Sequence, residues 1–459
     1  MLQFFTLICS FNFETRQTKL YITGDGTLSS SEVLKHCDKG QITEIYIGEG
    51  CIGFEAGTFF NFNALKVLHF PSTLKTTTGS DTRYCPQITN FYINSTNPYL
   101  EVDQYGALYT RGKERLIRVP TQKEQYIFPS QTKIIGEQAF EMHQKYIEIT
   151  IPNTVTTIEN GWIYDSCITK VFMQSGSTIT YIGDWSWAPT VWYILIAKSV
   201  KTLYQGAFSN CYALNIIEFE QDSDLELIES NVFSNTVLGS LRLPQKFKHL
   251  DANALYPDNF LTYVYIPASL TNINENAFTG CPNINSIEIG INNSNYIVIG
   301  SATLMTKDQS KFIYIPNDLV SFEIPEKIAT FGQTIFQSCS NLTTLTVSPN
   351  NNFLASDDGI VYSKDYYTAV ACMGGCVSTT INSQYRTIGS YCFKFCNKLE
   401  NVVLNENLIT LGNNAFERVS SLKEISIPST VLYIFDYCFY SSAVSKVIIN
   451  GDGPDFIGE

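Results

Sequence analysis

The chain has 459 residues, of which 44% are hydrophobic and only 16% are charged, and its formal net charge is −13. This acidic balance, with no run of basic residues, argues against nucleic acid or an anionic membrane as the partner, because both attract clustered Lys and Arg. No apolar stretch reaches the roughly 18 residues that a membrane-spanning helix needs, so we expect no membrane-spanning segment.

Residues 1–40 are expected to form an N-terminal flank and cap. The apolar start, "MLQFFTLICSFNF", has two open interpretations. It is either the hydrophobic region of a secretion signal that lacks a basic leader, or a cover for the open end of a repeat array, formed by Leu2, Phe4, Phe5, Leu7 and Ile8. Further on, "KLYITGDGTLSSSEVLKHC" predicts a strand, a Gly-Asp-Gly turn and a helix that starts at the serines, with Glu32 in its first turn.

Residues 41–450 repeat a unit of about 23 residues. In the stretch "NENAFTGCPNINSIEI" (274–289) the apolar spacing changes from 3 to 2, which is typical of a bend that leads into a strand. The large apolar residue at this bend, the anchor, recurs along the chain at Phe59, Phe140, Trp162, Trp185, Phe208, Phe233, Leu255, Phe278, Phe336, Phe393, Phe416 and Phe439. The gap after Phe59 contains a degenerate unit near Thr82. Because so short a unit cannot bury its own apolar side, the repeat predicts a solenoid whose strands pair in parallel.

Three enlarged coils, near residues 94–129, 290–325 and 348–382, interrupt this period. Their sequences align without gaps around Leu108, Leu304 and Val361. We expect each to form a β-hairpin, two short apolar strands around the turns "TRGKE", "TKDQS" and "SKDYY", which projects from its coil as a flap.

The last predicted strand, with Val444, Val447 and Ile449, runs directly into residues 451–459, which we expect to be a C-terminal tail. No amphipathic cap follows the strand. Because the open end of an array exposes its core, we expect either that the chain is truncated here or that another copy covers the end by self-association.

The repeated pattern resembles a known family. Segments such as "YIPASLTNINENAFTGCPNINSIEI" and "ISIPSTVLYIFDYCFYSSAVSKVII" are similar to BspA-like leucine-rich repeats, and so is the inserted "DGIVYSKD" hairpin. The resemblance extends over roughly residues 40–450. It implies a leucine-rich repeat solenoid, mainly parallel β with short bends and loops, few helices and three inserted β-hairpins. It also implies a surface or secreted protein that adheres to host proteins, matrix or other cells, and it defines no catalytic residues.

Cysteine spacing raises the question of a metal site. Cys372, Cys376, Cys392 and Cys396 have a spacing that would suit zinc. Cys392 and Cys396, however, stand at positions set by the repeat, where a free Cys packs as a small hydrophobic residue. We therefore expect buried free thiols and no metal.

Other polar motifs also have structural explanations. Asp357 and Asp358 in "SDDG" could bind a cation, but a turn explains them equally well, and we favour the turn. The four histidines lie in separate repeats or flanks, and no nucleotide-binding or hydrolase motif is present. We expect no catalytic residue, no cofactor and no enzymatic activity.

The outer face of the strands is the candidate binding surface. One side chain per strand should point outward between the second and third apolar positions, and the early part of that column is aromatic. We predict that the residues that contact a partner are Tyr46, Tyr92, Phe172, Leu195, Tyr265 and, beside the column, Trp192. Phe172, Trp192 and Leu195 are expected on successive coils. The alternative is that the column only stabilises the sheet by cross-strand stacking.

Two functions remain open. The first is a cell-surface or secreted adhesin for host–pathogen interaction, which binds host protein, extracellular matrix, glycan or another cell through its solenoid. Its partner would be a protein or glycan ligand on a host or microbial surface. The second is a cytoplasmic leucine-rich repeat scaffold for protein–protein assembly, which free cysteines would suit.

Overall fold

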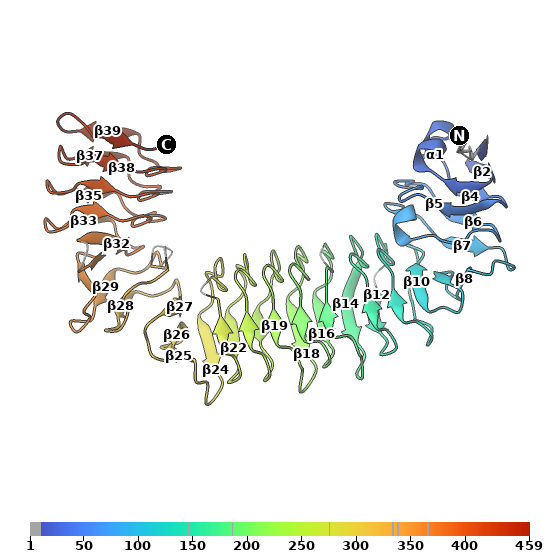
Figure 1. Cartoon of the computed structure of the whole chain (residues 1–459), viewed down its shortest axis with the longest axis horizontal. Coiled ribbons are helices and arrows are strands. Elements are labelled where there is room, and N and C mark those ends of the chain that lie inside the picture. Colours follow the sequence, from blue (N-terminus) through green and yellow to red (C-terminus); the bar gives the residue numbers. More distant parts are fainter. Residues whose placement is uncertain are drawn as a thin grey trace, which may run out of the picture. The chain divides into compact units, whose positions relative to one another are not determined.

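The computed structural model describes residues 11–459 apart from 146, 186, 275, 333–334, 337–338 and 365–366. The residues expected to serve as a secretion signal or end cover, Leu2, Phe4, Phe5, Leu7 and Ile8, lie outside this range. Contacts divide the chain into two units, Met1–Asp258 and Asn259–Glu459, which we describe separately (Figure 1). No helix among the described residues has the length and apolar character that crossing a membrane requires.

The first unit begins with the predicted strand, turn and helix. Strands β1 (Phe11–Arg16) and β2 (Lys19–Gly24) pair antiparallel, and β3 (Gly26–Leu28) leads into the helix α1 (Ser30–His36). Ser29 caps this helix: its hydroxyl accepts the Glu32 N–H at 3.3 Å, and the Glu32 carboxylate accepts the Ser29 N–H. Strand β2 then pairs in parallel with β4 (Glu44–Ile47), so the first strands join the sheet of the repeats.

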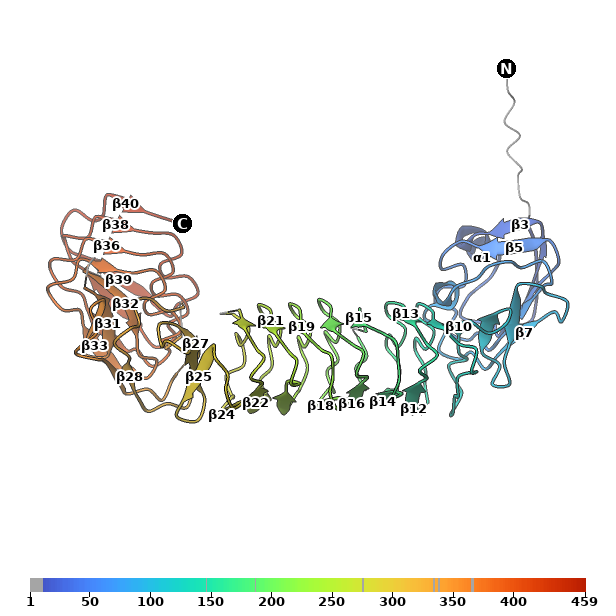
Figure 2. The same ribbon diagram turned by 60° about the horizontal axis from the view of Figure 1, so that its bottom comes forward.

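Most other strands of the first unit lie in parallel sheets formed by successive coils. The outer sheets contain β6 (Val67–Phe70) and β7 (Asn90–Ile93) next to β4, and separately β12 (Ile147–Ile151), β14 (Ile168–Met173), β16 (Tyr193–Ile196) and β18 (Ile216–Phe219). The opposite side of the coils carries β5 (Cys51–Phe54), β15 (Tyr181–Ile182), β17 (Thr202–Leu203), β19 (Leu227–Ile228) and β21 (His249–Leu250). The first unit also contains strand β20 (Ser240–Arg242) and a 3-10 helix at Gly79–Thr82. Figure 2 separates β12, β14, β16 and β18 from β15, β19 and β21 across the coils.

The core follows the repeat. In-register pairing places Val171, Ile194 and Ile217 side by side on β14, β16 and β18, and all three are buried. The anchors Trp162 and Trp185 are buried edge to face, with ring centroids 5.3 Å apart. Stacking copies of one position therefore builds one continuous column of core side chains, which confirms the predicted solenoid of mainly parallel strands.

The first enlarged coil differs from the predicted two-stranded flap. Three strands, β8 (Leu100–Val102), β9 (Leu108–Thr110) and β10 (Arg115–Arg118), pair antiparallel. Strand β10 then pairs in parallel with β11 (Ile134–Ile135), and β11 with β13 (Thr157–Ile158). Tyr109, Leu116 and Ile117 are buried. Because the consecutive residues Leu116 and Ile117 point to opposite faces of β10 and both are buried, the insert packs into the core and continues a sheet of the solenoid instead of projecting from it.

The second unit has the same construction. Its outer strands and short strands are β22 (Tyr263–Ile266), β23 (Asn272–Ile273), β24 (Ser286–Ile289), β28 (Ser321–Ile324), β29 (Thr344–Val347), β33 (Ser378–Thr380), β35 (Asn401–Val403), β37 (Glu424–Ile427) and β39 (Lys446–Ile449). Phe278 is buried in the bend that precedes β24, as the change of spacing in this stretch predicted.

Both inserts of the second unit are also three-stranded. They comprise β25 (Tyr296–Ile299), β26 (Thr303–Thr306) and β27 (Phe312–Tyr314), and then β30 (Leu354–Asp357), β31 (Ile360–Ser363) and β32 (Thr368–Cys372). Strand β32 begins a parallel series that continues through β34 (Thr387–Ile388), β36 (Thr410–Leu411), β38 (Tyr433–Ile434) and β40 (Phe456–Ile457).

Candidate functional site

The outward side chains of the first sheet form an aromatic ladder, which we define as Tyr21, Tyr46, His69 and Tyr92. Parallel pairing places Tyr21 opposite Tyr46, Tyr46 opposite His69, and His69 opposite Tyr92. Successive ring centroids lie 4.8, 4.1 and 4.9 Å apart, with ring planes within 11° of parallel. Because a solenoid repeats one strand register, an aromatic residue at one position in each unit produces a continuous stack.

Charged groups surround the start of the ladder. The Tyr46 hydroxyl donates to the Glu44 carboxylate at 2.6 Å, and Lys19 Nζ lies 3.0 Å from the same carboxylate. The hydrogen bond from Tyr46, and after it the contact with Lys19, lowers the pKa of Glu44. Burial lowers the pKa of His69, so this ring is neutral at pH 7. The middle of the ladder is therefore an uncharged aromatic stack held in place by its neighbours.

The two predicted contact residues in the ladder have different environments. The Tyr46 ring stacks on Tyr21 on one side and on His69 on the other, so a neighbouring ring covers each of its two faces. Tyr92 stands at the end of the stack and is 51% exposed. Tyr92 therefore offers more free ring surface to a partner than Tyr46, whose two ring faces are stacked on its neighbours.

A second group of predicted residues lies on β14 and β16. Phe172 is directly opposite Leu195, and both are half-buried on the outer face. Trp192 immediately precedes β16, so it belongs to the same coil as Leu195, and the expectation of three successive coils was wrong. Lys170 Nζ lies 5.3 Å from the centre of the Trp192 ring, which is a cation–π contact. Phe172, Leu195 and Trp192 thus form a short apolar patch on two neighbouring coils, with the Lys170 ammonium at its edge.

Tyr265 lies in the second unit, on β22. It points outward, is half-buried and pairs with Glu288 of β24. The preceding outward residue, Tyr263, donates a hydrogen bond to the Glu288 carboxylate. Tyr265 is therefore a separate candidate from the residues of the first unit.

Half of the outer face was not predicted from the sequence. Each four-residue strand has two outward positions, and only the second was predicted. The first position contributes Glu44, Lys170 and Tyr193, which contact the predicted residues. The signal was available, because the position directly before the second apolar residue must also point outward in a strand.

Other predicted polar groups have structural roles. Asp358 and Gly359 have φ angles of 46° and 74° and form the tight turn between β30 and β31, which confirms a turn at "SDDG". The twelve described cysteines are all free thiols, and all but Cys37 and Cys167 are buried, as expected. No three His, Cys, Asp or Glu side chains in the described ranges are grouped so that they could hold a metal.

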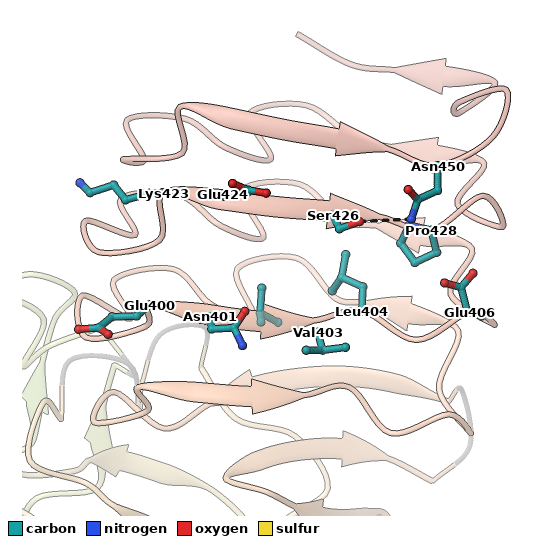
Figure 3. A pocket seen from close by; sticks show the side chains of 11 residues that line it. Glu400, Asn401, Val403, Leu404, Glu406, Lys423, Glu424, Ser426, Pro428 and Asn450 are labelled. Carbon is teal, nitrogen blue, oxygen red and sulfur yellow. Dashed lines mark hydrogen bonds between the residues drawn. The ribbon is translucent and has the colours of Figure 1, made fainter.

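A hollow in the second unit lies on the outer face of β35 and β37. Figure 3 shows its lining residues, including Glu400, Glu406 and Glu424, and the hydrogen bond of 3.2 Å that Asn450 donates to Ser426. The hollow is partly open to solvent, and the Glu424 carboxylate pairs with Lys446 Nζ at 3.0 Å. We assign no ligand to it.

Comparison with known proteins agrees with the geometry of the coils. The family model described as "BspA type Leucine rich repeat region" matches in six copies, over residues 8–106, 121–191, 186–301, 290–357 and 371–455. The chain belongs to this family. The BspA-type repeat accounts for the anchors, the outward column and the turns on the opposite side.

Several solved structures are similar to this BspA-type chain. A leucine-rich repeat protein from Eubacterium ventriosum is 21% identical, with 61% of this chain and 84% of that chain covered and a TM-score of 0.44. One from Bacteroides ovatus is 16% identical, with coverage of 94% and 95% and a TM-score of 0.42. The pneumococcal vaccine antigen PcpA is 16% identical, with coverage of 97% and 81% and a TM-score of 0.40. The search of curated protein sequences finds no match.

Proposed function

We propose that this BspA-type solenoid is a cell-surface or secreted adhesin. It binds a protein or glycan ligand on a host or microbial surface through the outer strand face. The observation that carries the proposal is the set of large apolar side chains on that face. Tyr92 is exposed at the end of the ladder. Phe172 on β14 lies opposite Leu195 on β16, and Trp192 stands directly before β16. Large side chains with few rotatable bonds give much contact area for little loss of entropy, as in binding hot spots.

A scaffold inside the cell is the second candidate. The free thiols favour it, because proteins exposed to oxidising surroundings commonly have paired cysteines. Surface biotinylation of intact cells, followed by detection of this chain, separates the two functions. Labelling comparable to that of a known surface protein is expected for the adhesin. Absence of label on intact cells, with full labelling after lysis, would reject it.

The contact residues are tested with one triple variant, Phe172→Ser, Trp192→Ser and Leu195→Ser. We expect lower affinity for a verified partner, with the fold retained, because these side chains point away from the core. The matched control is Tyr181→Ser with Tyr204→Ser, which removes two exposed aromatic rings from the opposite side of the same unit. Unchanged affinity in the triple variant would exclude this patch. Tyr46, Tyr92 and Tyr265 are then tested singly in the same assay.

A further inference from the structure

A second line of aromatic side chains runs along the bends of the first unit, away from the outer strands. We call it the corner row and define it as Phe60, Tyr84, Tyr164, Trp187 and Tyr212. Ring centroids of successive members are 5.3, 6.4, 6.5 and 6.3 Å apart. Each ring comes from a different coil, close after the buried anchor of that coil, so the row is long and one ring wide.

The backbone under two of these rings is unfavourable for bulky residues. Tyr84 and Trp187 have φ angles of 56° and 60°, in the left-handed region. Other coils place Asn61, Asp165 and Asn210 in this conformation at their corners, with φ between 50° and 63°. Asn and Asp tolerate the left-handed region better than aromatic residues do. A large ring in a position where a small polar residue is the better choice suggests a function for the ring.

Three of the five rings are exposed to solvent, and Tyr84 and Tyr164 are half-buried. Phe60, Trp187 and Tyr212 are 44%, 47% and 49% exposed. Burial of the row therefore does not explain their presence. Single exposed aromatic residues are common on protein surfaces, but a continuous line of them is characteristic of a binding surface.

The charge of the row is balanced within the protein. The Arg83 guanidinium lies 5.1 Å from the ring centre of Tyr84 and 5.2 Å from that of Tyr164. Behind it, the buried Glu141 carboxylate lies 3.3 Å from Arg83 Nε and 3.2 Å from the buried Arg118 Nη1, and the exposed Asp165 carboxylate next to Tyr164 supplies a second negative charge. Farther along, the Asn210 side-chain oxygen accepts hydrogen bonds from the Tyr212 hydroxyl and the Asn235 amide, at 3.2 and 2.8 Å. The strip thus combines aromatic rings with neutral amides and hydroxyls and with the opposite charges of Arg83 and Asp165.

The backbone at the corners has few groups to offer an added peptide strand. The N–H groups of Asn61, Asp165 and Trp187 donate to the carbonyls of Arg83, Trp187 and Ser209 in the following coils, at 2.9, 2.8 and 3.1 Å. An extended peptide that binds by strand addition needs such groups unpaired. The row is also too narrow for a standard interface between globular proteins, which buries about 800 Å² on each partner.

We propose that the corner row binds a linear, uncharged glycan. The C–H groups on the face of a pyranose ring carry partial positive charge and are attracted to the negative face of an aromatic ring. The hydroxyl groups of the sugar would exchange hydrogen bonds with the amides of Asn210 and Asn235. A narrow line of rings on successive coils suits a polymer that lies along it, with several sugar rings in contact at once. This site is separate from the strand face of the proposed adhesin and does not depend on where the protein is located.

The test is affinity electrophoresis of the purified full chain in gels that contain one soluble polysaccharide each. The neutral panel is glucan, mannan, galactan and xylan, and the comparison panel is hyaluronan, heparin and a proline-rich peptide coupled to dextran, with plain dextran as its blank. The dextran blank counts with the neutral panel, because dextran is itself an uncharged glucan, and only retardation by the peptide conjugate beyond that blank counts for the comparison panel. We expect retardation by at least one neutral polysaccharide. No retardation by any neutral member, or retardation only by the comparison panel, would overturn the proposal.

The decisive variant is Trp187→Asn combined with Tyr212→Ser. Asn suits the left-handed corner, so the melting temperature should stay unchanged or rise, while binding of the retarding polysaccharide should fall about 30-fold, as for loss of a hot-spot ring. The matched control is Tyr181→Ser with Tyr204→Ser, whose rings are equally exposed but lie outside the row. Glycan binding that persists in the corner variant, or is lost equally in the control, would contradict the assignment. The strand-face triple variant should keep glycan binding, so failure of either site is recognised separately.

Discussion

Arg118 Nη1 lies 3.2 Å from the Glu141 carboxylate, and both side chains are buried in the first unit. Arg118 ends strand β10 of the inserted coil, and Glu141 follows the anchor of the next coil. Arg118 also donates to the backbone carbonyls of Gln138 and Thr82. The guanidinium therefore ties the insert to the coil before it and to the coil after it. Burial raises the pKa of Glu141, whereas Arg118 and Arg83 act in the opposite direction.

Removal of one member of this pair should be costly. We expect Glu141→Ala to lower the free energy of unfolding by about 3–5 kcal/mol, because it leaves the buried Arg118 charge without its partner. The double variant Arg118→Met with Glu141→Leu should recover most of that loss, since apolar residues of similar volume replace both charges. Equilibrium denaturation of the two single variants and the double variant measures the coupling. Losses that simply add would show that the two residues do not interact.

The anchor of the second unit gives a test of the repeat. Phe278 is 4% exposed, and its ring centroid lies 5.8 Å from that of Tyr314. Phe278→Ala should cost about 3–5 kcal/mol, because it opens a cavity between coils. Phe353→Ala, at an exposed position of the same unit, is the control and should cost less than about 1 kcal/mol. Similar melting temperatures for the two variants would mean that the anchors do not form the core.

Sequence periodicity could predict the anchors and the outward column because each depends on one position of a short repeat. Phe278 and Tyr46 were found in this way. The three-stranded inserts were harder, since residues 100–102 form a strand too short for a clear alternation. The segment "RLIRVP" did indicate a buried charge, because Arg118 stands between the apolar residues Ile117 and Val119. Glu141 could not be identified from the sequence as the partner of Arg118, because their pairing depends on how the insert packs against the neighbouring coils.

The corner row was missed for a different reason. Tyr164 and Trp187 follow their anchors by two residues, but Phe60 follows its anchor by one and Tyr212 by four, so no single column of the repeat contains the whole row. Trp187 becomes notable only when its left-handed backbone is known. Likewise, the stacking of Tyr21 onto Tyr46 depends on the parallel pairing of β2 with β4, although residues 1–40 were expected to be a separate cap.

The aromatic ladder should contribute to stability through its interior members. We expect Tyr46→Ala to lower the free energy of unfolding by about 1–2 kcal/mol, because it removes two stacked contacts and a hydrogen bond to Glu44. Tyr92→Ala removes one stacked contact and should cost less than half as much. Denaturation by urea measures both. A larger loss for Tyr92→Ala would mean that the end of the ladder, and not its middle, holds the sheet together.

Acidification should destabilise the first unit through His143. This side chain is buried, its Nδ1 lies 3.2 Å from the Lys145 carbonyl oxygen, and burial lowers its pKa from 6.5 to about 4. Between these values the unfolded chain takes up a proton that the folded chain excludes, so the contribution of His143 is complete above pH 6.5 and is lost as the pH falls toward 4. The loss amounts to about 3 kcal/mol at most.

The effect of His143 must be isolated from that of the buried acids. Burial raises the pKa of Asp81, Asp103 and Glu141, which gives them the opposite dependence on pH. The measurement is therefore the difference in unfolding free energy between the natural chain and His143→Gln, taken at pH 7.5, 6 and 5. We expect the penalty of the substitution to shrink as the pH falls, because the natural chain loses the contribution that the variant already lacks. The control, His36→Gln, changes an exposed histidine. A penalty for His143→Gln that is the same at all three pH values would show that this histidine titrates alike in the folded and unfolded chains.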